Sequence, residues 1–191
     1  MLMINIPVSA EEQSQYINGV TQINGYTEFE QPQVIENQDM AQLGYSDIRA
    51  YEIENAGELA WFVQHFYAGD LETQNVSLAD NIDMSALAAY SWTPLGYYNV
   101  ETQTGKSYDG VFDGNGYSIS NIILNQINGV DLVSKVSEEQ AAVLGTQPIE
   151  NIAQNALAGV FGYIGSAGHV TELKLENTSI TSNADAGVLT G

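Results

Sequence analysis

Hydrophobic positions repeat with helical spacing in one part of the chain, the stretch "NAGELAWFVQHFYAGD". Its large apolar residues fall at i, i+3, i+4 and i+7, which places them on one face of a helix: Leu59, Phe62, Val63 and Phe66. Asn55 followed three residues later by Glu58 fits a capping box, and Gly69 fits a left-handed stop. The pattern predicts an amphipathic helix over about 56–68 whose apolar face covers another element.

After Gly69 the pattern changes to short runs rich in Val, Ile, Leu, Thr and Tyr, separated by Gly, Asn and Asp. Runs of this length with turn residues between them are typical of short β-strands. The predicted strands include 76–78, 117–119, 122–124, 170–175 and 179–180. Residues 1–45 carry a weaker pattern, and we expect an extended leader with one hairpin turning at Asn24-Gly25.

A repeat relates parts of this strand-rich region. The stretches "GVFDGNGYSISNIILN" from Gly110 and "GVFGYIGSAGHVTELKLEN" from Gly159 begin alike and both reach an alternating apolar pair followed by asparagine. A third start, "AGVLTG" at Ala186, matches "AGVFG" at Ala158. The interval from Gly159 to Gly187, roughly 28 residues, suits one circuit of a β-solenoid.

The sequence therefore predicts an all-β fold, a parallel β-helix (β-solenoid) over 46–191 with the 56–68 helix capping its N-terminal side. A polar insertion is expected at about 126–156. Stacked circuits would place apolar side chains of one copy on those of the next. The expected inner layers are Val111, Phe112, Ile119, Ile122 and Leu124 on Val160, Phe161, Val170, Leu173 and Leu175.

The chain of 191 residues is strongly acidic, with a net charge of −20 and four cationic residues, Arg49, Lys106, Lys135 and Lys174. This charge opposes binding to nucleic acid or anionic lipid. No apolar run is long enough to insert into a membrane, and the absence of cysteine excludes disulfides and thiolate sites. The N-terminus lacks a signal peptide, so a secreted protein would be represented here by a mature form or a piece.

Candidate catalytic and metal-binding residues are few. His65 and His169 lie far apart and form no zinc-peptidase motif. Four aspartates are weak calcium candidates, and no other cofactor is predicted: Asp80, Asp83, Asp109 and Asp113. An EF-hand loop from Asp113 would need a glutamate where Leu124 stands, so turn formation is favoured over metal binding at this aspartate.

Aromatic residues near one another in the sequence could form a platform for sugar rings, although packing in the core is the favoured interpretation. They are Trp92, Tyr97, Tyr98 and Tyr108. The four scattered cations offer no cluster for a polysaccharide lyase. A pair of carboxylates suited to a glycosidase is neither indicated nor excluded by the sequence.

The order of motifs from about residue 48 to 191 resembles the GLUG-motif family of bacterial surface proteins. The matching stretches are "GELAWFVQHFYAGD", "VSLADNIDMS", "WTPLG", "YDGVFDGNGYSISNIIL", "LAGVFGYIG" and "AGVLTG". Valine replaces the usual leucine in "AGVFG", and Thr190 stands where alanine or glycine is usual. The resemblance implies a right-handed β-helix in large secreted adhesins, and similar repeats flank some immunoglobulin A peptidases.

Together these observations predict a non-enzymatic module of a secreted cell-surface adhesin or filament, mediating attachment or self-assembly. We expect it at the bacterial cell surface, with self-association through the open C-terminal edge and a glycan or host surface as ligand. The alternative is a carbohydrate-binding or carbohydrate-active protein of the lyase or glycosidase type.

Overall fold

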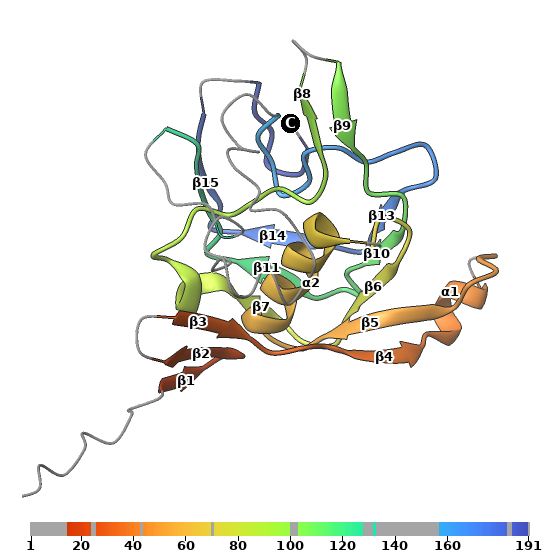
Figure 1. The fold of residues 1–191 in the computed structure, drawn as a ribbon. Helices are drawn as coiled ribbons and strands as arrows, with labels where there is room; N and C mark the ends of the chain where they lie inside the picture. The colour runs from red at the N-terminus through yellow and green to blue at the C-terminus, as the bar shows by residue number, and fades with distance from the viewer. Residues whose placement is uncertain are drawn as a thin grey trace, which may run out of the picture.

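The computed structural model describes residues 15–23, 26–42, 44–69, 71–99, 103–127, 132, 157–182 and 185–190. In its N-terminal half the elements are β1 (Gln15–Ile17), β2 (Val20–Ile23), β3 (Tyr26–Phe29), β4 (Gln33–Glu36), α1 (Gln38–Gln42), β5 (Arg49–Ile53), α2 (Ala56–Ala68), β6 (Asn75–Leu78), β7 (Ile82–Asp83) and the 3-10 helix η1 (Met84–Leu87). The later elements are β8 (Tyr97–Asn99), β9 (Thr104–Lys106), β10 (Val111–Asp113), β11 (Ser118–Ser120), β12 (Ile123–Asn125), β13 (His169–Thr171), β14 (Lys174–Glu176) and β15 (Ser179–Thr181). Figure 1 shows their arrangement.

The triplet Ile-Asn-Gly occurs twice near the N-terminus and shapes a three-stranded antiparallel sheet, β1-β2-β3. Asn18 and Gly19 have φ of 52° and 76° and link β1 to β2, as two-residue hairpins require. Ile23 pairs with Tyr26, so β2 and β3 form the predicted hairpin, while Asn24-Gly25 lies outside the described residues. The second turn was predicted from Asn24-Gly25, whereas the first was not predicted.

The helix predicted over 56–68 is confirmed as α2. The Asn55 side chain accepts a hydrogen bond from the backbone N–H of Glu58 at 2.9 Å, and the Glu58 carboxylate accepts one from the Glu54 N–H at 2.6 Å. The expected left-handed stop at Gly69 is wrong, because its φ of −164° is extended. Its N–H still bonds to the His65 carbonyl and ends the helix.

The prediction of an all-β, right-handed parallel β-helix is wrong. The described strands form five separate small sheets that mix parallel and antiparallel pairing, and the helices α1, α2 and η1 join them. The largest sheet has the order β13-β10-β6-β5-β4, and its β4–β5 pair is antiparallel. The β8–β9 hairpin forms a separate antiparallel sheet. Strand β4 lies within the expected leader yet pairs with β5.

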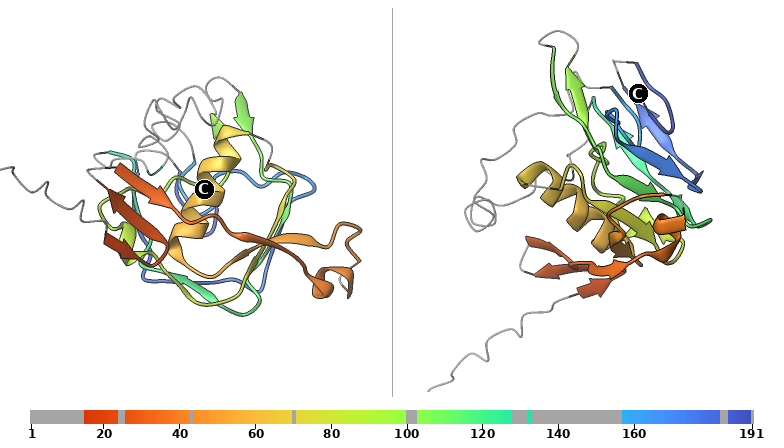
Figure 2. Two further views of the ribbon diagram at one scale, coloured as in Figure 1. Left: turned by 60° about the horizontal axis from the view of Figure 1, so that its bottom comes forward. Right: turned by 90° about the vertical axis from the view of Figure 1, so that its right-hand side faces the viewer.

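Parallel pairing joins β5 to β6 and builds three stacks of short strands. Strand β10 lies between β6 and β13, β11 lies between β7 and β14, and β12 pairs with β15. We call β13, β14 and β15 the last layer. In Figure 2 (left) the stacked strands surround α2, which lies across one end of the core.

The pairing expected between the repeat copies is wrong in register. Val111 and Phe112 pair with His169 and Val170 rather than with 160–161. Ile119 pairs with Leu175, and Leu124 pairs with Ile180. Phe161 instead forms isolated bridges with Leu95 and Thr190, so the second "GVF" lies on a different side of the stack from the first. The expected match of Ala158 with Ala186 is present as a parallel bridge.

Aromatic rings connect α2 with the stacked strands. Tyr108, fully buried, contacts Phe62 and Phe66 of α2 and also Phe161, with ring centroids 6.3 Å apart in each case. Phe112 meets Phe161 edge to face at 5.2 Å. The chain passes close to its neighbours here, since a Cβ on Gly114 would lie 2.4 Å from the Leu173 Cα. The helix therefore covers the stack, as its apolar face predicts.

Candidate functional site

The aspartates proposed for calcium bind nearby backbone or side-chain donors. Asp113, 5% exposed, accepts from the Asn115 N–H at 2.9 Å in an Asx turn. Asp83 caps η1 through the Ser85 N–H and accepts from the Asn121 side chain at 2.8 Å. These hydrogen bonds, that from Asn121 first, lower the pKa of the Asp83 carboxyl.

The other two calcium candidates also accept hydrogen bonds from groups of the fold. Asp109 accepts from the Ser107 hydroxyl and from the Ala167 N–H at 3.2 Å, and Asp80 accepts from the Asn81 N–H at 2.6 Å. Among the described residues, no three His, Cys, Asp or Glu side chains lie close enough together to hold a metal ion. The structure therefore does not bring the four aspartates into one site.

Two of the four candidate sugar-contacting aromatics lie in the core. Trp92 donates its Nε1–H to the Val160 carbonyl at 3.0 Å, and the Tyr108 hydroxyl donates to the Gln74 carbonyl at 2.9 Å. Neither ring presents a face to solvent, since Trp92 is 4% exposed and Tyr108 fully buried. Burial also raises the pKa of the Tyr108 phenol well above its usual range.

The other two candidates, Tyr97 and Tyr98, are half-buried on the β8–β9 hairpin. Tyr97 stacks on Tyr67, with centroids 6.1 Å apart, and Tyr98 lies 5.5 Å from the ring of Tyr163. Tyr163 is 39% exposed. Tyr163 was not predicted from the sequence, because its contact with Tyr98 joins residues far apart along the chain. Tyr98 and Tyr163 therefore form a partly exposed aromatic pair.

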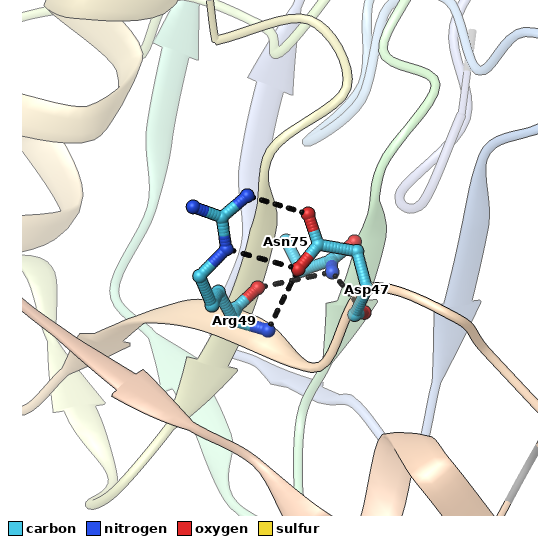
Figure 3. Close-up of polar contacts among 3 residues, drawn as sticks. All are labelled: Asp47, Arg49 and Asn75. Atoms are coloured by element: carbon cyan, nitrogen blue, oxygen red, sulfur yellow. Dashed lines mark hydrogen bonds and ion pairs between the residues drawn. The ribbon is translucent and has the colours of Figure 1, made fainter.

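Asn75 connects three segments of the chain through one buried side chain (Figure 3). Its Nδ2 donates to the carbonyls of Asp47 and Arg49, both at 3.0 Å, and its Oδ1 accepts from the Val111 N–H at 3.0 Å. The neighbouring Arg49 guanidinium forms a two-pronged ion pair with the Asp47 carboxylate, and both side chains are more than half exposed. In the sequence, Asn75 is marked only by its place directly before the predicted strand 76–78.

Lys106 lies at the C-terminal end of α2. Its ammonium donates to the carbonyls of Phe66 at 2.5 Å and Gly69 at 2.9 Å, and pairs with the Glu72 carboxylate at 2.8 Å. It also lies 4.9 Å from the centre of the Phe66 ring. A cation here is favoured by the helix dipole. No local sequence signal indicated this role.

An acidic group surrounds the N-terminal end of α2. Glu58 is buried, and burial raises the pKa of its carboxyl, with the neighbouring charges of Glu30 and Glu54 acting in the same direction. The Tyr16 hydroxyl donates to Glu30 at 2.6 Å. The carboxylates of Glu58 and Glu30 thus accept hydrogen bonds from neighbouring groups of the fold.

His65 contacts Trp61, one turn earlier on α2. Its Nδ1 lies 2.8 Å from the Trp61 carbonyl, and its ring stacks on Trp61 at 3.6 Å. Burial lowers the pKa of this imidazole.

A small cavity lies between η1 and the loop before β12. It is about 10 Å³ in volume and is lined by mostly apolar side chains, among them Met84, Leu87, Trp92 and Ile122. Such a volume has room for roughly one water molecule, whereas drug-sized ligands occupy clefts of roughly 300–1,000 Å³. This cavity is therefore no substrate pocket.

Comparison with known proteins gives one similarity to report. Halomucin from Haloquadratum walsbyi (strain DSM 16790 / HBSQ001) is 28% identical over 143 residues, which cover 74% of this chain and 1% of that protein. The chain thus spans a very small part of its relative. No family model matches the chain, and no solved structure matches it either. The resemblance to GLUG-motif proteins stays a prediction.

The similarity to a halomucin suggests a surface or secreted protein. None of the helices in the described part of the chain is long and apolar enough to cross a membrane.

Proposed function

We propose that the chain is a non-enzymatic structural module of a surface or secreted protein and contributes to attachment or self-assembly. The observation that carries this proposal is that the candidate polar side chains form hydrogen bonds with backbone groups of the fold itself. Asn75 joins three segments, Lys106 caps α2, and Asp83 and Asp113 hold turns.

Further support comes from the strand stacks themselves. Residues on the inner side, such as Phe112, Ile119 and Leu124, are at most 2% exposed, while charged residues such as Lys174 and Glu176 point to solvent. Apolar inner faces and a charged exterior stabilise the fold through burial of apolar surface. The similarity to a short part of a very long protein is consistent with a modular role.

The proposal is tested by searching for turnover and for metal dependence. We expect no release of reducing ends from a panel of neutral and acidic polysaccharides, and the same melting temperature in calcium and in EDTA. Turnover of any polysaccharide that persists after repurification would overturn the structural role. A melting temperature that falls by several degrees in EDTA would show that the fold depends on a metal.

A second candidate function, carbohydrate binding, is favoured by the partly exposed pair of Tyr98 and Tyr163. Aromatic faces pack against the apolar faces of sugar rings. A glycan array, run with and without calcium, tests it with the Tyr163→Ala variant. Binding by the native chain that is lost in this variant but kept in Tyr16→Ala, another exposed tyrosine, would establish this function. Failure of the native chain to bind any glycan would eliminate it.

A further inference from the structure

The last layer presents an edge whose backbone groups have no partner among the described strands. Strands β13, β14 and β15 each stand at the end of their sheet. Their first residues donate toward the strands below, from the N–H groups of His169, Lys174 and Ser179. Their last residues accept from the same side, through the carbonyls of Thr171, Glu176 and Thr181. Because alternate residues of a strand direct their N–H and C=O groups to opposite sides, the central residues face the open edge.

These central residues are Val170, Leu175 and Ile180, and they are evenly spaced along the chain. A two-residue corner separates each strand from the next, at 172–173 and at 177–178. The spacing of strands and corners along the edge is therefore the same in both directions from Leu175. A two-fold axis perpendicular to the axis of the stack, passing midway between Leu175 and its counterpart in a second copy, would bring one such edge onto another with all three strands in register.

We propose that a second copy of the chain pairs with the last layer in this way and forms a closed two-fold dimer. This proposal deepens the self-assembly part of the proposed function. Strand β14 would pair antiparallel with its counterpart, with Leu175 opposite Leu175 of the partner subunit. Val170 would lie opposite Ile180 of the partner subunit, and the reverse pair follows from symmetry. Each central residue would exchange both of its backbone hydrogen bonds with the residue opposite.

The side chains are complementary in this register. The central residues point inward and are only half-buried, whereas the inner residues one layer below are at most 2% exposed: Phe112, Ile119 and Leu124. A second copy would cover Val170, Leu175 and Ile180 with their own counterparts. Val188 and Leu189, whose carbonyls accept from the N–H groups of Val160 and Phe161, are 52% and 42% exposed and add apolar surface.

Charge selects the antiparallel arrangement. Lys174 and Glu176 flank Leu175 on the outer face, and the two-fold axis places Lys174 opposite Glu176 of the partner subunit, twice in each dimer. Such opposite-charge pairs stabilise antiparallel strands, and like charges directly opposite destabilise them. A copy added in parallel register would instead set lysine beside lysine and glutamate beside glutamate.

Charge reversal tests the register. We expect the native chain to sediment as a dimer at high protein concentration in about 0.15 M salt, where the repulsion between two acidic copies is screened beyond about 8 Å. Lys174→Glu and Glu176→Lys should each weaken dimerisation at least tenfold, because each places like charges opposite one another. An equimolar mixture of the two variants should form a heterodimer, since every facing pair is then opposite in sign.

The matched control is Glu28→Lys, which makes the same charge change as Glu176→Lys on exposed β3, away from the last layer. It should leave the dimer intact. Circular dichroism verifies folding, which matters most for Lys174→Glu because the Lys174 ammonium donates to the Gly116 carbonyl at 2.5 Å.

Single cysteines give a second test, because the native sequence has none. Positions 174 and 176 of facing strands would be a non-hydrogen-bonded pair, with Cα atoms about 4.5 Å apart, close enough for a disulfide. A mixture of Lys174→Cys and Glu176→Cys should form a mixed disulfide in air far faster than either variant alone.

Some outcomes overturn the proposal. A native chain that stays monomeric at millimolar concentration would leave the edge to another occupant, such as a further strand layer of a longer chain. Open-ended growth into larger species, or equal crosslinking of each cysteine variant with itself, would exclude the closed two-fold pair. None of these results bears on polysaccharide turnover, so the structural role and the dimer can fail separately.

Discussion

The Nζ atom of Lys106 lies 2.9 Å from the carbonyl oxygen of Gly69, so one of the few cations of this acidic chain caps the C-terminal end of α2. The contact joins the β8–β9 hairpin to the C-terminal end of α2, which lies 37 residues earlier in the chain. A single side chain thereby ties the hairpin to the core.

Replacing Lys106 by methionine should destabilise the protein by about 1–2 kcal/mol, because two helix carbonyls lose a charged donor while the aliphatic part of the side chain is kept. Urea unfolding followed by circular dichroism measures the change. Arg49→Met, which removes an exposed cation paired with Asp47, is the control and should cost less than half as much. Equal losses would argue against a special role for the helix terminus.

Asn75→Ala should cost about 2–4 kcal/mol, because it leaves one buried N–H and two carbonyls without their partner. The measurement is the free energy of unfolding. Asn81→Ala is the matched control: Asn81 is exposed and accepts from the backbone and hydroxyl of Ser118, so its loss should be smaller. Hydrogen exchange should also quicken at the Val111 amide in the first variant only.

The buried carboxyl of Glu58 should make stability depend on pH. Its pKa is raised in the folded state, so the folded protein binds the proton more tightly than the unfolded chain does. Stability should then fall as pH rises from the unfolded pKa through the folded one, and stay level above it. Thermal unfolding between pH 4 and 8, as an approximate range, covers this window.

The Glu58→Gln variant isolates this effect from that of the overall negative charge. Glutamine keeps a hydrogen-bonding group at this helix position but does not titrate, so we expect a shallower pH dependence and greater stability at pH 7 than in the native chain. Glu28→Gln, at an exposed position, should keep the native slope. Parallel curves for native and Glu58→Gln proteins would contradict the prediction.

Asn121 should be replaceable by glycine but not by alanine. Its φ is 59°, and Asn177, which follows the strand paired with β11, has a φ of 50°, so the corner requires a left-handed residue. Alanine should cost about 1–2 kcal/mol more than glycine there, because its Cβ crowds the following carbonyl. Both variants lose the bond to Asp83, so NMR titration should show the pKa of the Asp83 carboxyl rising toward its usual value in each.

The sequence predicted the parts of the fold that depend on neighbours along the chain. Helix α2 was predicted correctly because Asn55, Glu58 and the apolar stripe lie within its own limits. The β2–β3 hairpin followed from a two-residue turn signal. Both rest on local propensity and spacing.

The wrong predictions concern contacts between distant segments. Val111 pairs with His169 rather than Val160, although the two "GVF" stretches match in letters. Register is decided by corners such as those at Asn121 and Glu172, and by the path between them, which the repeat alone does not fix. The strand β4 also changes the topology, since its antiparallel pairing with β5 has no counterpart in a β-helix.

For the candidate site, the sequence indicated core packing but not the long-range partners. Packing was the favoured interpretation of Trp92 and Tyr108, and both lie in the core. Lys106, Asn75 and Tyr163 matter through partners that only the folded chain supplies. Burial and long-range hydrogen bonding distinguish these residues from the ones that were predicted, and neither property follows from residue type.

The two tryptophans of the chain occupy different surroundings, and this gives the protein a pair of built-in optical probes. Trp61 stacks on His65 at the partly exposed face of α2, whereas Trp92 is enclosed beside Val160. Emission from Trp61 should respond to protonation of the stacked imidazole, and emission from Trp92 should shift to the red only when the strands separate. Fluorescence of single-tryptophan variants can thus distinguish loosening of the helix from melting of the whole molecule.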